Sequence, residues 1–211
     1  MTLEALENII KKYERPLIGI IGAANPLPDY DSDDGYRLGY ELREAVNNKG
    51  TLFTGGVPGI GVDVYSGIVD YSVEKGLDDK FFILFPEMEM EPSEDYFTLA
   101  NKTKNGSLRV EKIGKDMGER RSYIAAVADL VVLINGSTGT LDETLKSLYL
   151  GKQILCLQNS GGAARVISRF KKGEVEIPLD IDKSLITTFD SISELTKYLS
   201  TEFLNKLGEN K

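Results

Sequence analysis

The chain has 211 residues, 41% of them hydrophobic and 27% charged, with 25 Lys and Arg against 33 Asp and Glu and a formal net charge of −8. This length suits one sizeable hydrophobic core, and the negative charge repels nucleic-acid backbones and anionic membranes, so we expect neither as a partner. The absence of histidine excludes Ser/His and Cys/His dyads, the single Cys156 excludes an internal disulfide, and no apolar run approaches the roughly 20 residues of a membrane helix, so we expect a cytoplasmic protein.

The predicted elements alternate between helices and strands. A leading amphipathic helix within residues 1–14 comes before Pro16 and is expected to pack on the main domain. Five apolar runs are typical of buried strands: Leu17–Ile21, Thr51–Thr54, Phe81–Phe85, Leu130–Ile134 and Gln153–Leu157. Helices are expected at 35–48, 60–74, 117–128, 141–150 and 191–207.

This alternation predicts an α/β fold in which helices cover both faces of a parallel sheet. We expect a Rossmann-like, doubly wound, three-layer α/β/α arrangement that forms a single domain at 15–211. Residues 86–115 interrupt the pattern, because they are polar and only weakly periodic apart from an expected strand at about 108–113. We expect this segment to be a lid or an edge insertion.

Ligands of open parallel sheets bind beyond the carboxyl ends of the strands. Four loops at such positions are unusual: 22–25, 55–61, 135–140 and 158–162. The glycines of loop 55–61 would let the backbone approach a phosphate, and the alternative is a turn that needs positive φ. This loop lacks both the G-x-G-x-x-G and the P-loop patterns, which argues against a standard hydride-transfer site and a nucleoside-triphosphate motor.

Two carboxylates follow loop 135–140 at a predicted helix start. Asp142 and Glu143 would lie beside an anion held by the loop. Thr140 and Glu143 also have the spacing of a capping box, in which Glu143 bonds back to the Thr140 amide. That spacing alone favours the cap.

Arg120 and Arg121 lie near the start of another predicted helix. Cations oppose the helix dipole at that end, so a ligand or a carboxylate partner would explain them. The alternative is a solvated or intrahelical pair with Asp116 or Glu119.

Two other features favour structural interpretations. The acidic run at 29–34 lacks the spacing of a calcium-binding loop and is expected to cap the helix that follows it. Cys156 falls inside a predicted strand and is expected to be part of the core.

Three ordered motifs resemble those of the lonely guy (LOG) family and its wider SLOG superfamily. They are T-G-G-V-P-G-I at 54–60, M-G-E-R-R at 117–121 and G-S-T-G-T-L-D-E at 136–143. The family has G-G-x-x-G, then M-x-x-R-K, then P-G-G-x-G-T-x-x-E, and the resemblance covers about residues 17–170. This chain differs in having Asn135 for the proline, Ser137 for the second glycine and Arg121 for the lysine.

The resemblance implies a phosphoribohydrolase that cleaves a nucleoside 5′-monophosphate, such as AMP, into base and ribose 5-phosphate. Glu143 would stabilise oxocarbenium character and activate water, and Arg120, aligned with the family's catalytic arginine, would hold Glu143 or the ribose. No metal or other cofactor is required. Phosphate or nucleotide contacts are expected from Gly22, Ala23, Gly55, Gly56, Gly59, Ile60, Arg121, Gly136, Ser137, Thr138, Gly139 and Thr140.

A binding module is the rival hypothesis. Residues 160–165 resemble glycine-rich loops of SLOG members that bind NAD-derived nucleotides, which implies a sensor or carrier of an ADP-ribose-like ligand without turnover. Additional ligand contacts are then expected from Asn25, Asn159, Gly161 and Gly162. A molybdenum-cofactor carrier shares this fold group and is a third hypothesis. Related proteins commonly form dimers, so we expect a homo-oligomer.

Overall fold

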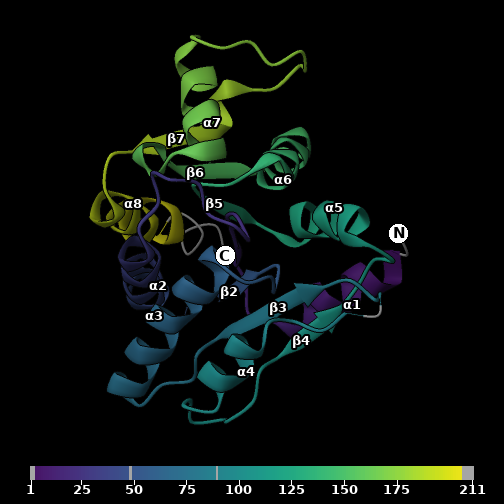
Figure 1. Cartoon of the computed structure of the whole chain (residues 1–211), viewed down its shortest axis with the longest axis vertical. Coiled ribbons are helices and arrows are strands. Elements are labelled where there is room, and N and C mark those ends of the chain that lie inside the picture. Colours follow the sequence, from purple (N-terminus) through teal and green to yellow (C-terminus); the bar gives the residue numbers. More distant parts are fainter. Residues whose placement is uncertain (1–2, 48, 89, 206–211) are drawn as a thin grey trace.

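Seven parallel strands form one sheet in the order β4-β3-β2-β1-β5-β6-β7 (Figure 1). The computed structural model describes residues 3–47, 49–88 and 90–205. β1 pairs with β2 on one side and with β5 on the other, so the strand order reverses there, where ligands of such sheets bind. The strands are β1 (Leu17–Ile21), β2 (Thr51–Thr54), β3 (Phe81–Phe85), β4 (Val110–Lys112), β5 (Leu130–Ile134), β6 (Gln153–Leu157) and β7 (Ile186–Phe189).

Helices cover both faces of this sheet (Figure 1). One face packs against α2 (Ser32–Val46), α3 (Ile60–Lys75), α4 (Glu94–Ala100) and α8 (Ile192–Tyr198). The other packs against α1 (Leu3–Lys12), α5 (Met117–Val127), α6 (Thr138–Tyr149) and α7 (Gly162–Lys172). The predicted three-layer, Rossmann-like α/β/α fold is therefore confirmed. No helix in the described part of the chain is both long and apolar enough to cross a membrane.

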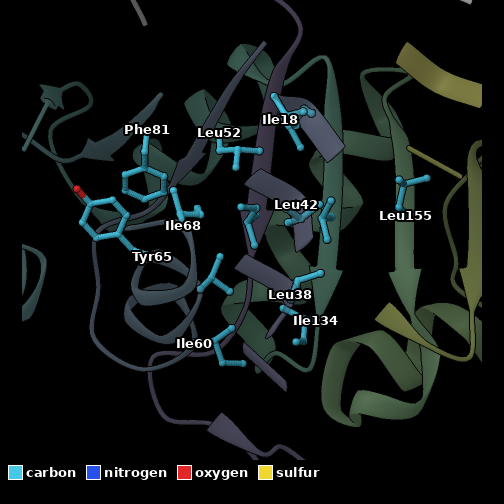
Figure 2. Close-up of a cluster of buried hydrophobic side chains, with 14 of the residues drawn as sticks. Ile18, Leu38, Leu42, Leu52, Ile60, Tyr65, Ile68, Phe81, Ile134 and Leu155 are labelled. Atoms are coloured by element: carbon cyan, nitrogen blue, oxygen red, sulfur yellow. The ribbon is translucent and has the colours of Figure 1, made fainter. Parts of the chain in front are cut away.

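Alternate residues of each strand supply two separate apolar clusters, because successive side chains of a strand point to opposite faces. Val132 and Ile134 belong to the cluster under α2 and α3, whereas Val131 and Leu133 belong to the cluster under α5 and α6. Figure 2 shows the first cluster. Cys156 lies in the second, where burial raises the pKa of its thiol to about 12, and its expected place in the core is confirmed.

Residues 86–115 contain α4 and β4. β4 lies inside the strand expected at 108–113 and pairs with β3, so it is the last strand at that edge of the sheet. α4 packs on the α3 side, where Tyr96 is completely buried. This segment therefore contributes to the sheet and to the core beneath it.

Several boundaries differ from the predictions. The helix expected at 35–48 begins at Ser32, because the Asp31 carboxylate accepts the Asp33 N–H at 3.0 Å and caps it, as the acidic run suggested. The helix expected at 191–207 is α8 followed by a π-helical turn, Leu199–Phe203. Residues 48, 206 and 207 of these expected helices lie outside the described residues. α4, α7 and β7 were not predicted.

Candidate functional site

The carboxyl ends of β1 and β2 meet α3, α5 and α6 around a small cavity. Its volume of about 20 Å³ is enough for roughly one water molecule. Glycines, apolar side chains and a threonine form most of its wall, and one arginine and one glutamate are its charged residues. The lining residues are Ile20, Ile21, Gly22, Thr54, Gly55, Val57, Ile60, Gly61, Arg120 and Glu143.

Arg120 and Glu143 form a buried ion pair beside this cavity. Arg120 Nη2 donates to Glu143 Oε1 over 3.0 Å, and the two residues are only 4% and 5% exposed. Arg120 Nη1 donates to the carbonyl oxygen of Gly55, which ties the pair to the loop after β2. Arg120 Nε is buried and has no hydrogen-bond partner within the described residues. A buried N–H is unfavourable unless it donates, so Nε is a candidate donor to a ligand or water oxygen.

Burial and ion pairing shift the pKa values of Arg120 and Glu143 in opposite directions. Burial raises the pKa of Glu143, while the positive charges of Arg120 and Arg121 act to lower it. For Arg120, burial disfavours the charged form and so lowers its pKa, while the negative charge of Glu143 acts to raise it. A carboxylate with a raised pKa is a better proton acceptor than an exposed glutamate, so Glu143 suits general-base chemistry.

The structure contradicts the capping-box interpretation of Glu143. The N-cap of α6 is Ser137, three residues before the cap expected at Thr140, and the helix begins at Thr138. The Glu143 carboxylate bonds to Arg120 across the α5–α6 contact. The spacing that favoured a cap is therefore coincidental, because Ser137 is the N-cap and the Glu143 carboxylate pairs with Arg120.

The intrahelical alternative for the two arginines is also wrong. The Asp116 carboxylate accepts the Glu119 N–H and caps α5. Arg120 pairs with Glu143, and Arg121 Nη1 lies 3.7 Å from Asp142 Oδ2, so both arginines reach from α5 to α6. Carboxylate partners on another helix thus offset the unfavourable position of these cations.

Among the described residues, four helices that start at this edge of the sheet have no side-chain cap. Their N-caps are Gly59 for α3, Ser93 for α4, Ser137 for α6 and Gly161 for α7. By contrast, α2, α5 and α8 are capped by aspartate or serine side chains. At α3 the Ile60 N–H donates to the Ala23 carbonyl, and at α7 the Ala163 and Ala164 N–H groups donate to the carbonyls of Gly136 and Asn135. The first turn of α6 is therefore the best placed of these starts to bind an anion through its backbone N–H groups, and the helix dipole adds to that attraction.

Arg121 adds a cation at the start of α6. A Cβ placed on Gly139 would lie 3.0 Å from Arg121 Nη2, so the guanidinium lies directly against the first turn. Ser137 and Thr138, in the same turn, are exposed. This first turn therefore combines backbone N–H groups, two hydroxyls and a guanidinium, which is chemistry suited to a phosphate.

Two glycines of loop 55–61 adopt positive φ angles that other residues rarely adopt. Gly56 and Gly59 have φ of +71° and +83°, values that favour glycine, and they turn the chain from β2 into α3. The positive-φ interpretation of this loop is therefore correct for these two residues, and it is compatible with a role in binding.

Gly55 has a different constraint, which gives a testable prediction. A Cβ there would lie 2.5 Å from Arg120 Nη1 and 2.9 Å from its Cζ, so Gly55→Ala should displace the buried guanidinium. We expect a loss of about 1–3 kcal/mol in the free energy of unfolding, measured with urea. Gly118→Ala in α5 is the matched control, because its Cβ would meet only the Asp116 carboxylate, at 3.3 Å. Equal stability of the two variants would contradict this packing.

The other residues predicted to contact the ligand lie at different distances from the cavity. Gly22 lines the cavity, and Ala23 accepts the Ile60 N–H through its carbonyl. Asn25 is exposed in the loop after β1. Asn159 donates to Asp190, next to β7, so its side chain serves that contact and does not join the Arg120–Glu143 pair.

Gly161 and Gly162 lie in a tightly packed turn before α7. A Cβ on Gly161 would approach Asp29 to 2.8 Å, and one on Gly162 would approach the carbonyl of Gly136 to 2.2 Å. Close packing therefore requires glycine at both positions. Asp29 in turn pairs with Arg165 of α7 at 2.9 Å, so the loop after β1 lies over the start of α7.

Sequence reasoning missed Asn135, which joins three loops of the site. This buried residue has φ of +50°, and its backbone N–H donates to Ser160 Oγ at 2.6 Å. Its side-chain Nδ2 donates to the carbonyl of Ser160, and its Oδ1 accepts the N–H groups of Leu27 and Gly136. The only signal in the sequence was its departure from the proline of the LOG pattern.

Comparison with known proteins identifies the fold but no family. No family model matches the chain, and no curated protein matches its sequence. Among solved structures, the structural-genomics target TM1055 has a TM-score of 0.63 at 22% identity over 88% of this chain and 98% of its own. The molybdenum-cofactor carrier protein of Chlamydomonas reinhardtii has a TM-score of 0.61 at 15% identity, covering 92% and 99%.

DNA processing protein A of Helicobacter pylori, described with a single-stranded DNA binding mode, has a TM-score of 0.59 at 15% identity, covering 99% of this chain and 85% of its own. At these identities the likeness shows a shared fold and nothing more specific. The expected exclusion of nucleic acid and the expected homo-oligomer both remain predictions.

Proposed function

We propose that the protein binds a nucleoside 5′-monophosphate and hydrolyses its N-glycosidic bond, giving a free base and ribose 5-phosphate. The observation that carries this proposal is the buried Arg120–Glu143 pair beside a cavity with room for about one water molecule. Hydrolysis through an oxocarbenium-like state uses a carboxylate and a water, and here the guanidinium of Arg120 holds that carboxylate in place.

The phosphate would bind at the first turn of α6. Backbone N–H groups there have no side-chain cap, and Arg121 lies against Gly139. A phosphate at this turn would place the attached ribose within reach of the cavity, because Glu143 is on the second turn of the same helix. The nucleotide itself must lie at the cavity mouth beside the partly exposed Gly22, Val57 and Gly61, since a pocket for such a ligand needs hundreds of cubic ångströms.

In the reaction, the bond between C1′ and the base nitrogen breaks and its electron pair leaves with the base. The water oxygen forms the new bond to C1′, Glu143 accepts the water proton, and the base takes up a proton from solvent. Arg120 acts on Glu143 by holding its Oε1 and on the loop by holding the Gly55 carbonyl. The negative Glu143 carboxylate stabilises the positive charge that develops on the ribose.

Binding without turnover is a second candidate, and one observation favours it. Glu143 is 5% exposed and paired, and the cavity that it lines is about the size of one water molecule. A carrier would then use the same turn of α6 for phosphate, with the glycosidic bond left intact. The carrier protein from Chlamydomonas reinhardtii shows that this fold exists in a protein described as a cofactor carrier.

Incubation with AMP, GMP, CMP and UMP separates the two candidates. We expect base and ribose 5-phosphate to accumulate with at least one of these nucleotides, measured by chromatography, and Glu143→Gln to reduce the rate at least 100-fold. Glu174→Gln, which alters an exposed glutamate paired with Arg169, is the control and should leave the rate unchanged. An intact nucleotide that co-elutes with the protein, without free base, would support the carrier instead.

A further inference from the structure

Three consecutive carbonyls of the loop after β2 are each held by a different donor. The Gly55 carbonyl accepts from Arg120, the Gly56 carbonyl accepts the Ser93 N–H at 3.3 Å, and the Val57 carbonyl accepts the Tyr96 hydroxyl at 3.2 Å. Two of the three donors belong to residues 86–115, at the start of α4. This segment therefore helps to set the path of the loop that lines the cavity.

The Tyr96 hydroxyl closes a ring of hydrogen bonds within the loop. The Gly56 N–H donates to Thr54 Oγ1 at 3.3 Å, and Thr54 Oγ1 lies 3.3 Å from the Tyr96 hydroxyl. With Tyr96 donating to Val57, the Thr54 hydroxyl donates to Tyr96, and each polar group has a partner. The ring is buried, where such a chain of hydrogen bonds is strong and a missing member is costly.

This arrangement fixes which backbone groups face the site. In a trans peptide the carbonyl and the next N–H point in opposite directions, so a Gly56 carbonyl held toward Ser93 directs the Val57 N–H away from α4. Tyr96 also approaches the start of α3, because a Cβ on Gly61 would lie 2.2 Å from its hydroxyl oxygen. Its ring is held separately by Tyr65 and Phe81, at centroid distances of 5.7 and 6.4 Å.

We propose that Tyr96 is a positioning residue of the nucleotide site, and that residues 86–115 are through it an integral part of that site. Its hydroxyl holds loop 55–61 in the shape in which Gly55 can accept Arg120 and Val57 and Gly61 can border the ligand. Tyr96 touches neither the ribose nor the base and acts through the loop. The functional part of this inference rests on the proposed function.

Tyr96→Phe tests the inference, with Tyr65→Phe as the matched control. Both tyrosines are fully buried in the same aromatic cluster, and each variant loses one buried hydroxyl. The Tyr65 hydroxyl donates to Asp79, however, and has no contact with loop 55–61. We expect amides of residues 55–61 to exchange with deuterium at least ten times faster in Tyr96→Phe and within twofold of the wild-type rates in Tyr65→Phe.

The same pair of variants is then assayed with AMP. We expect kcat/KM for base release to fall at least tenfold in Tyr96→Phe with a rise in the KM for AMP, and less than twofold in Tyr65→Phe. If the wild-type protein releases no base from any of AMP, GMP, CMP and UMP, the hydrolase proposal fails, while the exchange rates still decide the role of Tyr96. Unchanged exchange of residues 55–61 in Tyr96→Phe, or equal acceleration in Tyr65→Phe, would overturn the inference.

Discussion

Replacing Arg120 with methionine is expected to lower the free energy of unfolding by about 3–5 kcal/mol at pH 8, because it leaves a buried carboxylate without its partner. Glu143 is 5% exposed, and Arg120 is the residue that ion-pairs with it among those described. The Gly55 carbonyl loses a donor in the same change. Urea denaturation measures the loss, and base release from the nucleotide panel is expected to disappear with it.

The destabilisation should be smaller at pH 5 than at pH 8. Burial already raises the pKa of Glu143 above its value in the unfolded chain, and loss of the Arg120 charge raises it further. The folded state then binds more protons than the unfolded state, so the stability of Arg120→Met falls as pH rises. An equal loss at both pH values would contradict this assignment of the charge.

A double variant tells whether the pair exists for stability or for function. Arg120→Met with Glu143→Leu removes both charges and replaces them with apolar groups of similar size, which proteins often tolerate without loss. We expect it to recover most of the stability that Arg120→Met loses and to remain inactive. If the double variant lost as much free energy of unfolding as Arg120→Met and Glu143→Leu lose together, the ion pair would be needed for folding itself.

The sheet could be predicted because its strands are buried on both faces, and such strands are continuous apolar runs such as Leu130–Ile134. β7 escaped prediction because Ile186–Phe189 is short, half polar and only partly buried. α7 escaped because it begins within a glycine-rich turn that the sequence analysis assigned to a loop. α4 lies in a polar segment whose apolar positions are too few to show a period.

The proximity of Arg120 and Glu143 could be predicted from the sequence, because motifs that follow parallel strands lie together at one edge of the sheet. The resemblance to the LOG pattern also implied that Arg120 would hold Glu143, although local spacing alone favoured a cap at Thr140. The pairing of Arg121 with Asp142 was not predicted. The sequence carried no signal for Tyr96, and for Asn135 it carried only the departure from the proline of the LOG pattern. Their roles arise from hydrogen bonds to Val57 and Leu27, which lie 39 and 108 residues away in the sequence.

Asn135→Pro would introduce the proline of the LOG pattern, yet it is expected to destabilise this protein by several kcal/mol, on the order of 3–5. Proline fixes φ near −65°, whereas Asn135 has φ of +50°. It also removes the N–H that donates to Ser160 Oγ and leaves the N–H groups of Leu27 and Gly136 without their acceptor. Urea denaturation is again the measurement.

Two further substitutions separate the contributions that the backbone conformation and the side chain of Asn135 make to the free energy of unfolding. Asn135→Gly loses the same side-chain hydrogen bonds as Asn135→Ala but accepts a positive φ, so it should be the more stable of the two. The expected order of stability is wild type, then the glycine, alanine and proline variants. A proline variant as stable as the wild type would show that the loop can adopt a backbone path that accommodates proline. In that case Asn135 would not be what holds the loops after β1, β5 and β6 together, and its three side-chain hydrogen bonds would be dispensable.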